Sequence, residues 1–165
     1  MKKIAILILA LILVLPLSAC GKNAKYTQIG NSDLYFVLPE GYTLAEDDFD
    51  EDQIAYYYKD DDSIDFDVYQ WEKGDKYTLE SEANAFAAEY GTTAEAVTVK
   101  GIKGMKYVSK EEYEGNIYTV VNYMFEDDVY IVELCFWTVD TAEEYKAVDE
   151  IISTLKMSRL FGLVF

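Results

Sequence analysis

Histidine is absent from this sequence, and cysteine occurs only twice. Without histidine, the chain lacks the commonest general base, the usual partner of a serine or cysteine nucleophile, and the commonest zinc ligand. Cys20 follows an apolar N-terminal run, whereas Cys135 lies between Leu134 and Phe136 in a hydrophobic segment. We expect Cys135 to be a small buried apolar residue, with no internal disulfide and no zinc cluster in the domain.

Basic residues are also scarce, because 14 lysines and arginines accompany 31 aspartates and glutamates and leave a net charge of −17. Such a surface repels phosphates, so we expect neither nucleic acid nor anionic lipid as a partner. It favours solubility, and it also suits cations or a basic partner.

Phosphate-binding sequences are missing too, since Gly101 and Gly104 lack the pattern of a glycine-rich loop. Most routine catalytic machinery is therefore excluded, and we expect no enzymatic activity. The remaining catalytic alternative is a hydrolase that uses paired carboxylates, which the many acids supply without singling out one pair.

The chain begins with a short basic segment and an uninterrupted apolar run from Ile4 to Leu17. Charge, apolar run and small residues in this order are typical of a secretory signal peptide. As a helix the run would measure about 21 Å, against roughly 30 Å of hydrocarbon in a bilayer. This length disfavours the alternative of a permanent transmembrane helix.

Residues Leu17-Ser18-Ala19-Cys20 resemble the lipobox of bacterial lipoproteins. The resemblance covers the first 21 residues and implies diacylglycerol on the Cys20 thiol and cleavage before Cys20. Two acyl chains, at about 0.8 kcal/mol per buried methylene, would anchor the mature protein stably on the outer face of the cell membrane. We expect a signal peptide at 1–19, the lipidated cysteine and a tether at 20–29, one domain at 30–157, and an apolar tail at 158–165.

Two runs rich in β-branched and aromatic residues, 116–125 and 129–137, flank an acidic turn at 126–128. This pattern predicts a β-hairpin. Because both runs are apolar on both faces, we expect the hairpin at the centre of a sheet that is covered on each side.

The remaining periodicity predicts two amphipathic helices and several further strands. Thr78 and Gly91 are the expected ends of the first helix, and a capping box at Asp140–Glu143 or Thr141–Glu144 begins the second, which we expect to end near Lys156. Strands are expected at 34–38, 42–44, 54–58, 64–71, 96–100 and 105–109, with a turn at 111–115. The fold class is α+β, an antiparallel sheet of about six strands with helices packed against it.

This order of elements, the stretch from Phe36 to Tyr42 and the helix after a long hairpin together resemble the PsbP-like fold. That fold is shared by the photosystem II extrinsic protein and by small bacterial lipoproteins of the DcrB type. The resemblance covers about residues 26–157 and implies an α/β/α sandwich. It carries no functional residue with it, because a fold does not determine a function.

One predicted strand carries a candidate binding face. Residues 64–71 alternate, so that Asp65, Asp67, Tyr69 and Trp71 share one side. An aromatic and acidic face is typical of modules that bind sugars, peptides or basic proteins. The alternative is that a helix covers Tyr69 and Trp71.

Clustered carboxylates suggest calcium as a possible ligand. The segment from Asp61 to Glu72 departs from an EF-hand, because Phe66 occupies the position where the loop needs glycine. A weaker site at Asp47, Asp48, Asp50 and Asp52, or at residues 60–62, stays open, and we expect no other cofactor.

The sequence thus favours a lipid-anchored, extracytoplasmic, non-enzymatic binding or accessory module. A calcium-binding module and a carboxylate-based hydrolase are the alternatives. The expected partners are the membrane, through Cys20, and a basic protein, a peptide or a sugar in the envelope.

Replacing the expected lipid attachment residue tests the location. We expect Cys20→Ser to abolish both lipid attachment and signal removal, because the thiol is the atom that would carry the diacylglycerol. Metabolic labelling with a tagged fatty acid measures this, with Cys135→Ser as the control that keeps its label. A Cys20→Ser protein that is still labelled would contradict the assignment.

Overall fold

The computed structural model describes residues 25–46, 49, 51–59, 64–74, 77–137 and 140–158. The predicted signal peptide, Cys20 and the apolar tail after residue 158 lie outside the described residues. So do three of the four calcium candidates, Asp47, Asp48 and Asp50, together with residues 60–62.

The main sheet has seven antiparallel strands in the order β3-β4-β5-β9-β8-β7-β6, one more strand than expected. Its members are β3 (Thr43–Leu44), β4 (Gln53–Tyr58), β5 (Phe66–Glu72), β6 (Glu95–Val99), β7 (Ile102–Tyr113), β8 (Asn116–Glu126) and β9 (Tyr130–Trp137). A separate three-stranded sheet, in the order β1-β2-β10, contains β1 (Tyr26–Gln28), β2 (Leu34–Val37) and β10 (Lys156–Met157).

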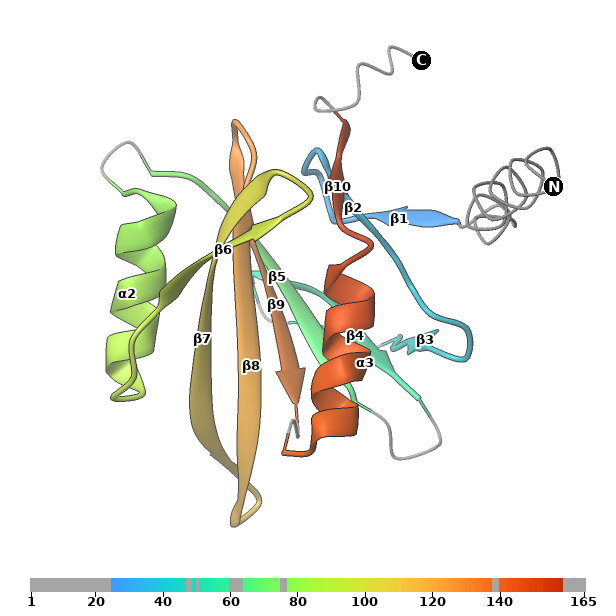
Figure 1. Ribbon diagram of the computed structural model, residues 1–165, viewed down its shortest axis with the longest axis vertical. Helices are drawn as coiled ribbons and strands as arrows, with labels where there is room; N and C mark the ends of the chain where they lie inside the picture. Colours follow the sequence, from blue (N-terminus) through green and yellow to red (C-terminus); the bar gives the residue numbers. More distant parts are fainter. Residues whose placement is uncertain are drawn as a thin grey trace, which may run out of the picture.

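Two helices, α2 (Leu79–Glu89) and α3 (Ala142–Ile152), flank the main sheet. They lie on opposite sides of the strands in Figure 1, which makes the domain an α/β/α sandwich with an α+β topology. In the described part of the chain, no helix combines the length and the apolar character needed to cross a bilayer.

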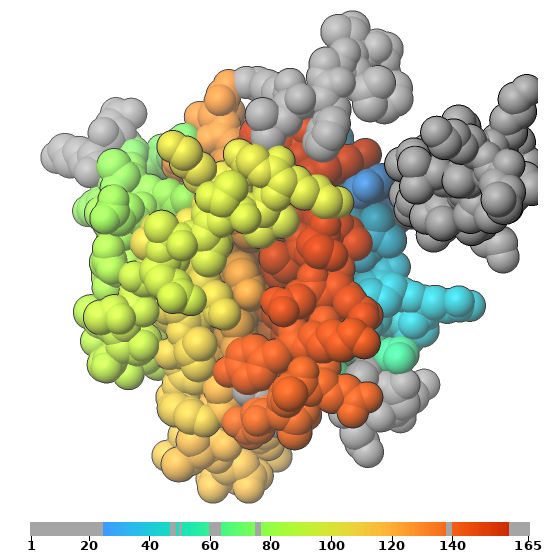
Figure 2. Space-filling model, in the orientation of Figure 1, coloured from blue at the N-terminus to red at the C-terminus, as the bar shows by residue number. Residues whose placement is uncertain are grey.

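The β8–β9 hairpin lies at the centre of the sheet and is buried on both faces, as its composition predicted. On one face Val121, Tyr123 and Phe125 join a core with residues of α3 such as Ile151. On the other face Met124 packs with Ala83 of α2. Figure 2 shows α3 at the surface of the first face, beside the β6–β7 hairpin.

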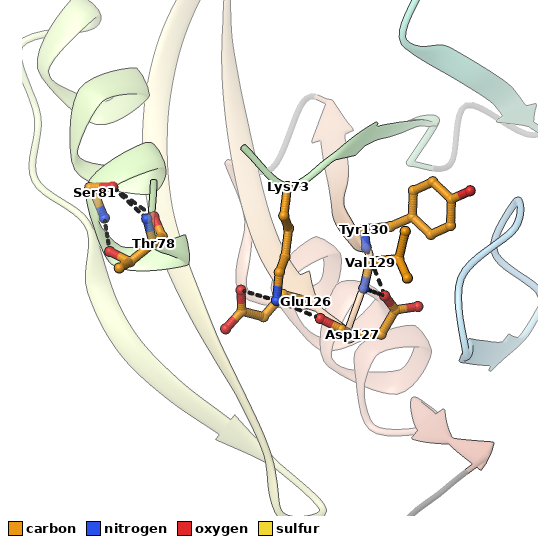
Figure 3. A network of polar contacts seen from close by, with 7 residues as sticks. All are labelled: Lys73, Thr78, Ser81, Glu126, Asp127, Val129 and Tyr130. Atoms are coloured by element: carbon orange, nitrogen blue, oxygen red, sulfur yellow. Dashed lines mark hydrogen bonds and ion pairs between the residues drawn. The ribbon is translucent and has the colours of Figure 1, made fainter. Parts of the chain in front are cut away.

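Local contacts fix the ends of the central elements (Figure 3). In the β8–β9 turn, Asp127 accepts the backbone N–H groups of Val129 and Tyr130 at 2.7 Å each, and Lys73 donates to the Asp127 carbonyl at 2.7 Å. Burial alone would raise the pKa of Asp127, but these backbone donors and that of Asp33 lower it below its ordinary value.

Both helices begin with a reciprocal cap. Thr78 and Ser81 exchange side-chain and backbone hydrogen bonds at the start of α2. Thr141 and Glu144 do the same for α3, which selects the second of the two capping boxes that the sequence offered.

Several boundaries differ from the expected ones, and three of these differences have a clear physical reason. Residues 26–28 of the expected tether form β1 against β2, and Ile29 is only 2% exposed, so the fold includes the end of that segment. The α3 helix ends at Ile152, because Ser153 and Thr154 turn their hydroxyls onto the carbonyls of the last turn. The β7 strand continues to Tyr113, since its pairing with β8 extends to the Glu114–Gly115 turn.

Candidate functional site

A pocket of about 640 Å³ opens beside α2, on the face of the sheet opposite α3. Six aromatic residues line it: Tyr69, Trp71, Phe86, Tyr90, Tyr107 and Trp137. Five acidic residues line it as well: Glu51, Asp52, Glu82, Glu111 and Glu133. Asn122 and Cys135 complete the wall, and no lysine or arginine is among the described residues that form it. The volume is ordinary for a small-molecule site.

The pocket lies on the part of this face that α2 leaves uncovered. Eleven helical residues extend about 16 Å, whereas the 11 residues of β8 extend about 37 Å. The helix packs mainly on β7 and β8, through the buried side chains Leu79, Ala83 and Ala87. Much of β5 and β9 on this face therefore stays outside the helix contact.

Strand register places the pocket residues next to one another. Glu133 of β9 pairs with Tyr69 of β5 on one side and with Met124 of β8 on the other. In the neighbouring row, Cys135 pairs with Asn122, which in turn pairs with Tyr107 of β7. Each row thus joins pocket residues to a residue that packs with α2, which is Met124 in the first row and Tyr107 in the second.

Glu133 is the chemically unusual member of this set, because it is only 6% exposed. The Tyr107 hydroxyl donates to its Oε1 at 2.6 Å and is its one hydrogen-bond donor among the described residues. Burial raises the pKa of Glu133 to about 7, and the negative charge of Glu111 adds to this, while the bond from Tyr107 opposes it. Near neutral pH this carboxyl is therefore poised between its neutral and charged forms.

The aromatic walls are held by ring contacts between elements. Phe86 of α2 meets Trp71 of β5 edge to face, with centroids 5.8 Å apart. Tyr90 stacks on Tyr107 at 6.4 Å. Burial raises the pKa of Tyr69 and of Tyr107, so both phenols stay protonated at neutral pH.

Of the four residues of the predicted binding face, two line the pocket and two do not. Tyr69 and Trp71 line the pocket, and Trp71 also contacts α2, so the helix covers this face only partly. Asp67 is 7% exposed and accepts hydrogen bonds from Gln53 at 2.6 Å and from the Trp137 indole. Asp65 accepts one from Tyr56 at 2.8 Å. Neither carboxylate lines the pocket. Both instead accept hydrogen bonds from neighbouring side chains.

Sequence reasoning did not identify Glu133, Tyr107 or Trp137 as site residues. Glu133 carried a usable signal, because it is the one charged residue in the apolar run 130–137. Tyr107 and Trp137 resembled ordinary core aromatics, and only the pairing of their strands brings them to the pocket.

Two further expectations concern cysteine and calcium. Cys135 is buried in the sheet, as predicted, and its burial raises the pKa of the thiol well above its ordinary value. Asp52, the described member of the calcium set, lines the pocket. Within the described ranges, no three acidic or cysteine side chains come close enough together to hold a metal ion.

Comparison with known proteins identifies the fold. No family model matches the chain, and no curated protein matches its sequence. The solution structure of the cyanobacterial PsbP protein CyanoP from Synechocystis superposes with a TM-score of 0.59 at 15% identity, over 86% of this chain and 99% of that one. The domain has a PsbP-like fold.

Two other solved structures agree with this assignment. LpqN of Mycobacterium tuberculosis, a protein involved in cell envelope biogenesis, matches with a TM-score of 0.55 at 13% identity, over 84% of this chain and 87% of its own. A Bacteroides thetaiotaomicron protein matches with a TM-score of 0.57 at 16% identity over 81% of this chain. The present chain spans about half of that protein, 48% of its length. At these identities the likeness establishes the fold alone.

The buried carboxyl gives stability a defined pH dependence. The pKa of Glu133 is about 7 in the folded protein and near 4.5 when exposed, so the folded state binds the extra proton between these values. Stability should therefore fall as pH rises from 5 to 8. Glu133→Gln should flatten this slope and raise the free energy of unfolding at pH 8 by on the order of 1–3 kcal/mol.

Urea unfolding of the purified protein across this pH range measures the effect. Glu112→Gln, at an exposed position of β7, is the matched control and should leave the slope unchanged. An unaltered slope in Glu133→Gln would show that Glu133 does not titrate in this range.

Proposed function

We propose that the protein is a lipid-anchored, extracytoplasmic binding module whose ligand site is the pocket beside α2. The observation that carries this proposal is the pocket itself, a cavity of about 640 Å³ with aromatic and acidic walls on one face of the sheet. Aromatic walls with a few polar groups are the usual composition of ligand sites.

The proposed location rests on the lipobox-like sequence before Cys20. Five residues separate Cys20 from β1, which begins at Tyr26. Even fully extended, five residues reach only about 17 Å, so an anchored domain would lie close to the bilayer. An envelope location is in keeping with the role of LpqN in cell envelope biogenesis.

Binding is a better proposal than catalysis, because the chain has no histidine and its buried thiol is protonated. One observation favours a hydrolase as the second candidate: a carboxyl with a pKa of about 7 in an open pocket, as in Glu133, is suited to act as a general acid. Turnover of a glycan or peptide by the purified protein, lost in Glu133→Gln, would establish that alternative.

The pocket proposal is tested by a matched pair of tyrosines. Tyr90 lies on the pocket wall and is 44% exposed, whereas Tyr145 lies on α3, on the opposite face, and is 36% exposed. Both tryptophans of the protein, Trp71 and Trp137, line the pocket, so intrinsic fluorescence reports its occupancy directly.

Titration with amines, sugars, amino acids and short peptides should reveal at least one class that changes the fluorescence saturably. We expect Tyr90→Ala to weaken that binding about 5- to 30-fold, because it removes about 1–2 kcal/mol of ring contact, while Tyr145→Ala has no effect. Equal behaviour of the two variants, or no saturable change with any class, would refute the pocket as a binding site.

A further inference from the structure

The charge on the pocket wall is of one sign. Its five acidic residues come from β7, β9, α2 and the segment before β4, so negative charge surrounds the cavity. No basic side chain in the described part of the wall balances them. Because charges of one sign in a concave site add their potentials, the cavity attracts a cation and repels an anion.

Several hydrogen-bond donors of the wall are already engaged within the protein. Tyr107 donates to Glu133, the Trp137 indole donates to Asp67, and the Asn122 amide donates to Ser109 at 3.1 Å. These three donors are already satisfied by protein acceptors. With its five carboxylates the wall also offers many acceptors, which suits a ligand that brings donors or positive charge.

Glu133 lies where a positive charge would be most stabilising. A buried carboxylate with a single donor is incompletely compensated, and a cation at hydrogen-bonding distance would supply what is missing. The surrounding rings can stabilise such a cation further through cation–π contact when they are desolvated. Trp71 and Tyr69 lie on the strand beside Glu133, and Tyr90, the C-cap residue of α2, lines the same pocket.

We propose that this pocket binds a small organic cation, with the ammonium group placed against Glu133 and enclosed by the aromatic rings. The inference rests on the proposed function, since it names the ligand class of the same site. The occupant is a small molecule rather than a protein side chain, because the space is a cavity of small-molecule size.

Proton release should accompany this binding. The titratable groups that line the pocket with Glu133 come from every neighbouring element: Tyr107 and Glu111 of β7, Tyr69 of β5, Glu82 of α2, Tyr90 at its C-cap, Glu51 and Asp52 before β4, and Cys135 on its own strand. None of these groups is a cation, so a ligand ammonium would be the charge that favours ionised Glu133. With a pKa of about 7, the ionised fraction of Glu133 rises about tenfold between pH 6 and pH 8, and affinity should follow it.

The test compares choline with its neutral isostere 3,3-dimethyl-1-butanol, which differs by one charge and hardly in shape. Both are titrated into the full lipidated protein in neutral detergent while tryptophan fluorescence is recorded. We expect choline to bind at least tenfold more tightly, Glu133→Gln to lose this preference, and Glu112→Gln to keep it. In the unmodified protein, choline affinity should rise about tenfold from pH 6 to pH 8.

Three outcomes would overturn the inference. The first is equal binding of choline and its isostere, and the second is a choline affinity that changes neither with pH nor in Glu133→Gln. The third is binding of a trilysine peptide without binding of choline. The pH series needs no variant, so a misfolded Glu133→Gln protein would not remove the test. Saturable binding of a neutral sugar that Tyr90→Ala weakens, without binding of choline, would refute an organic cation as the ligand. The proposal of a binding module would then still stand.

Discussion

The structure depends on the need to cover both faces of the β8–β9 hairpin. Apolar side chains project from each side of these strands, so a layer must pack on either face. On one face α3 and the three-stranded sheet complete the cover, with Leu34, Phe36 and Leu155 fully buried there. On the other face α2 covers only part of the surface, and the uncovered part is where the acidic and aromatic residues gather.

That incomplete cover explains the chemistry of the site. Glu133 is buried by its strand neighbours and by α2, yet it remains at the edge of the cavity. Burial alone would favour its neutral form, and the negative charge of Glu111 acts in the same direction. A positively charged ligand would reverse this balance, so the geometry that opens the pocket also couples its occupancy to a proton.

Much of the fold could be predicted from the sequence, because periodicity, capping residues and turn residues act locally. The hairpin, both helices and the burial of Cys135 followed from such patterns. The end of the expected tether was placed too far along the chain. Residues Tyr26–Gln28 form a strand by pairing with β2, and that pairing is a tertiary contact. Similarly, Asp67 looked like an exposed charge until its strand brought it to Gln53 and Trp137. Glu133 and Tyr107 are 26 positions apart, and only tertiary pairing joins them.

The central claim is that a negatively charged, solvent-accessible pocket lies beside α2 with both tryptophans on its wall. Collisional quenching by caesium and by iodide at equal ionic strength tests it most directly, with each ion normalised to its quenching of free tryptophan amide. Because the pocket is negatively charged, caesium should quench Trp71 and Trp137 more strongly than iodide does. Quenching by iodide equal to or greater than that by caesium, or access for neither ion, would contradict it.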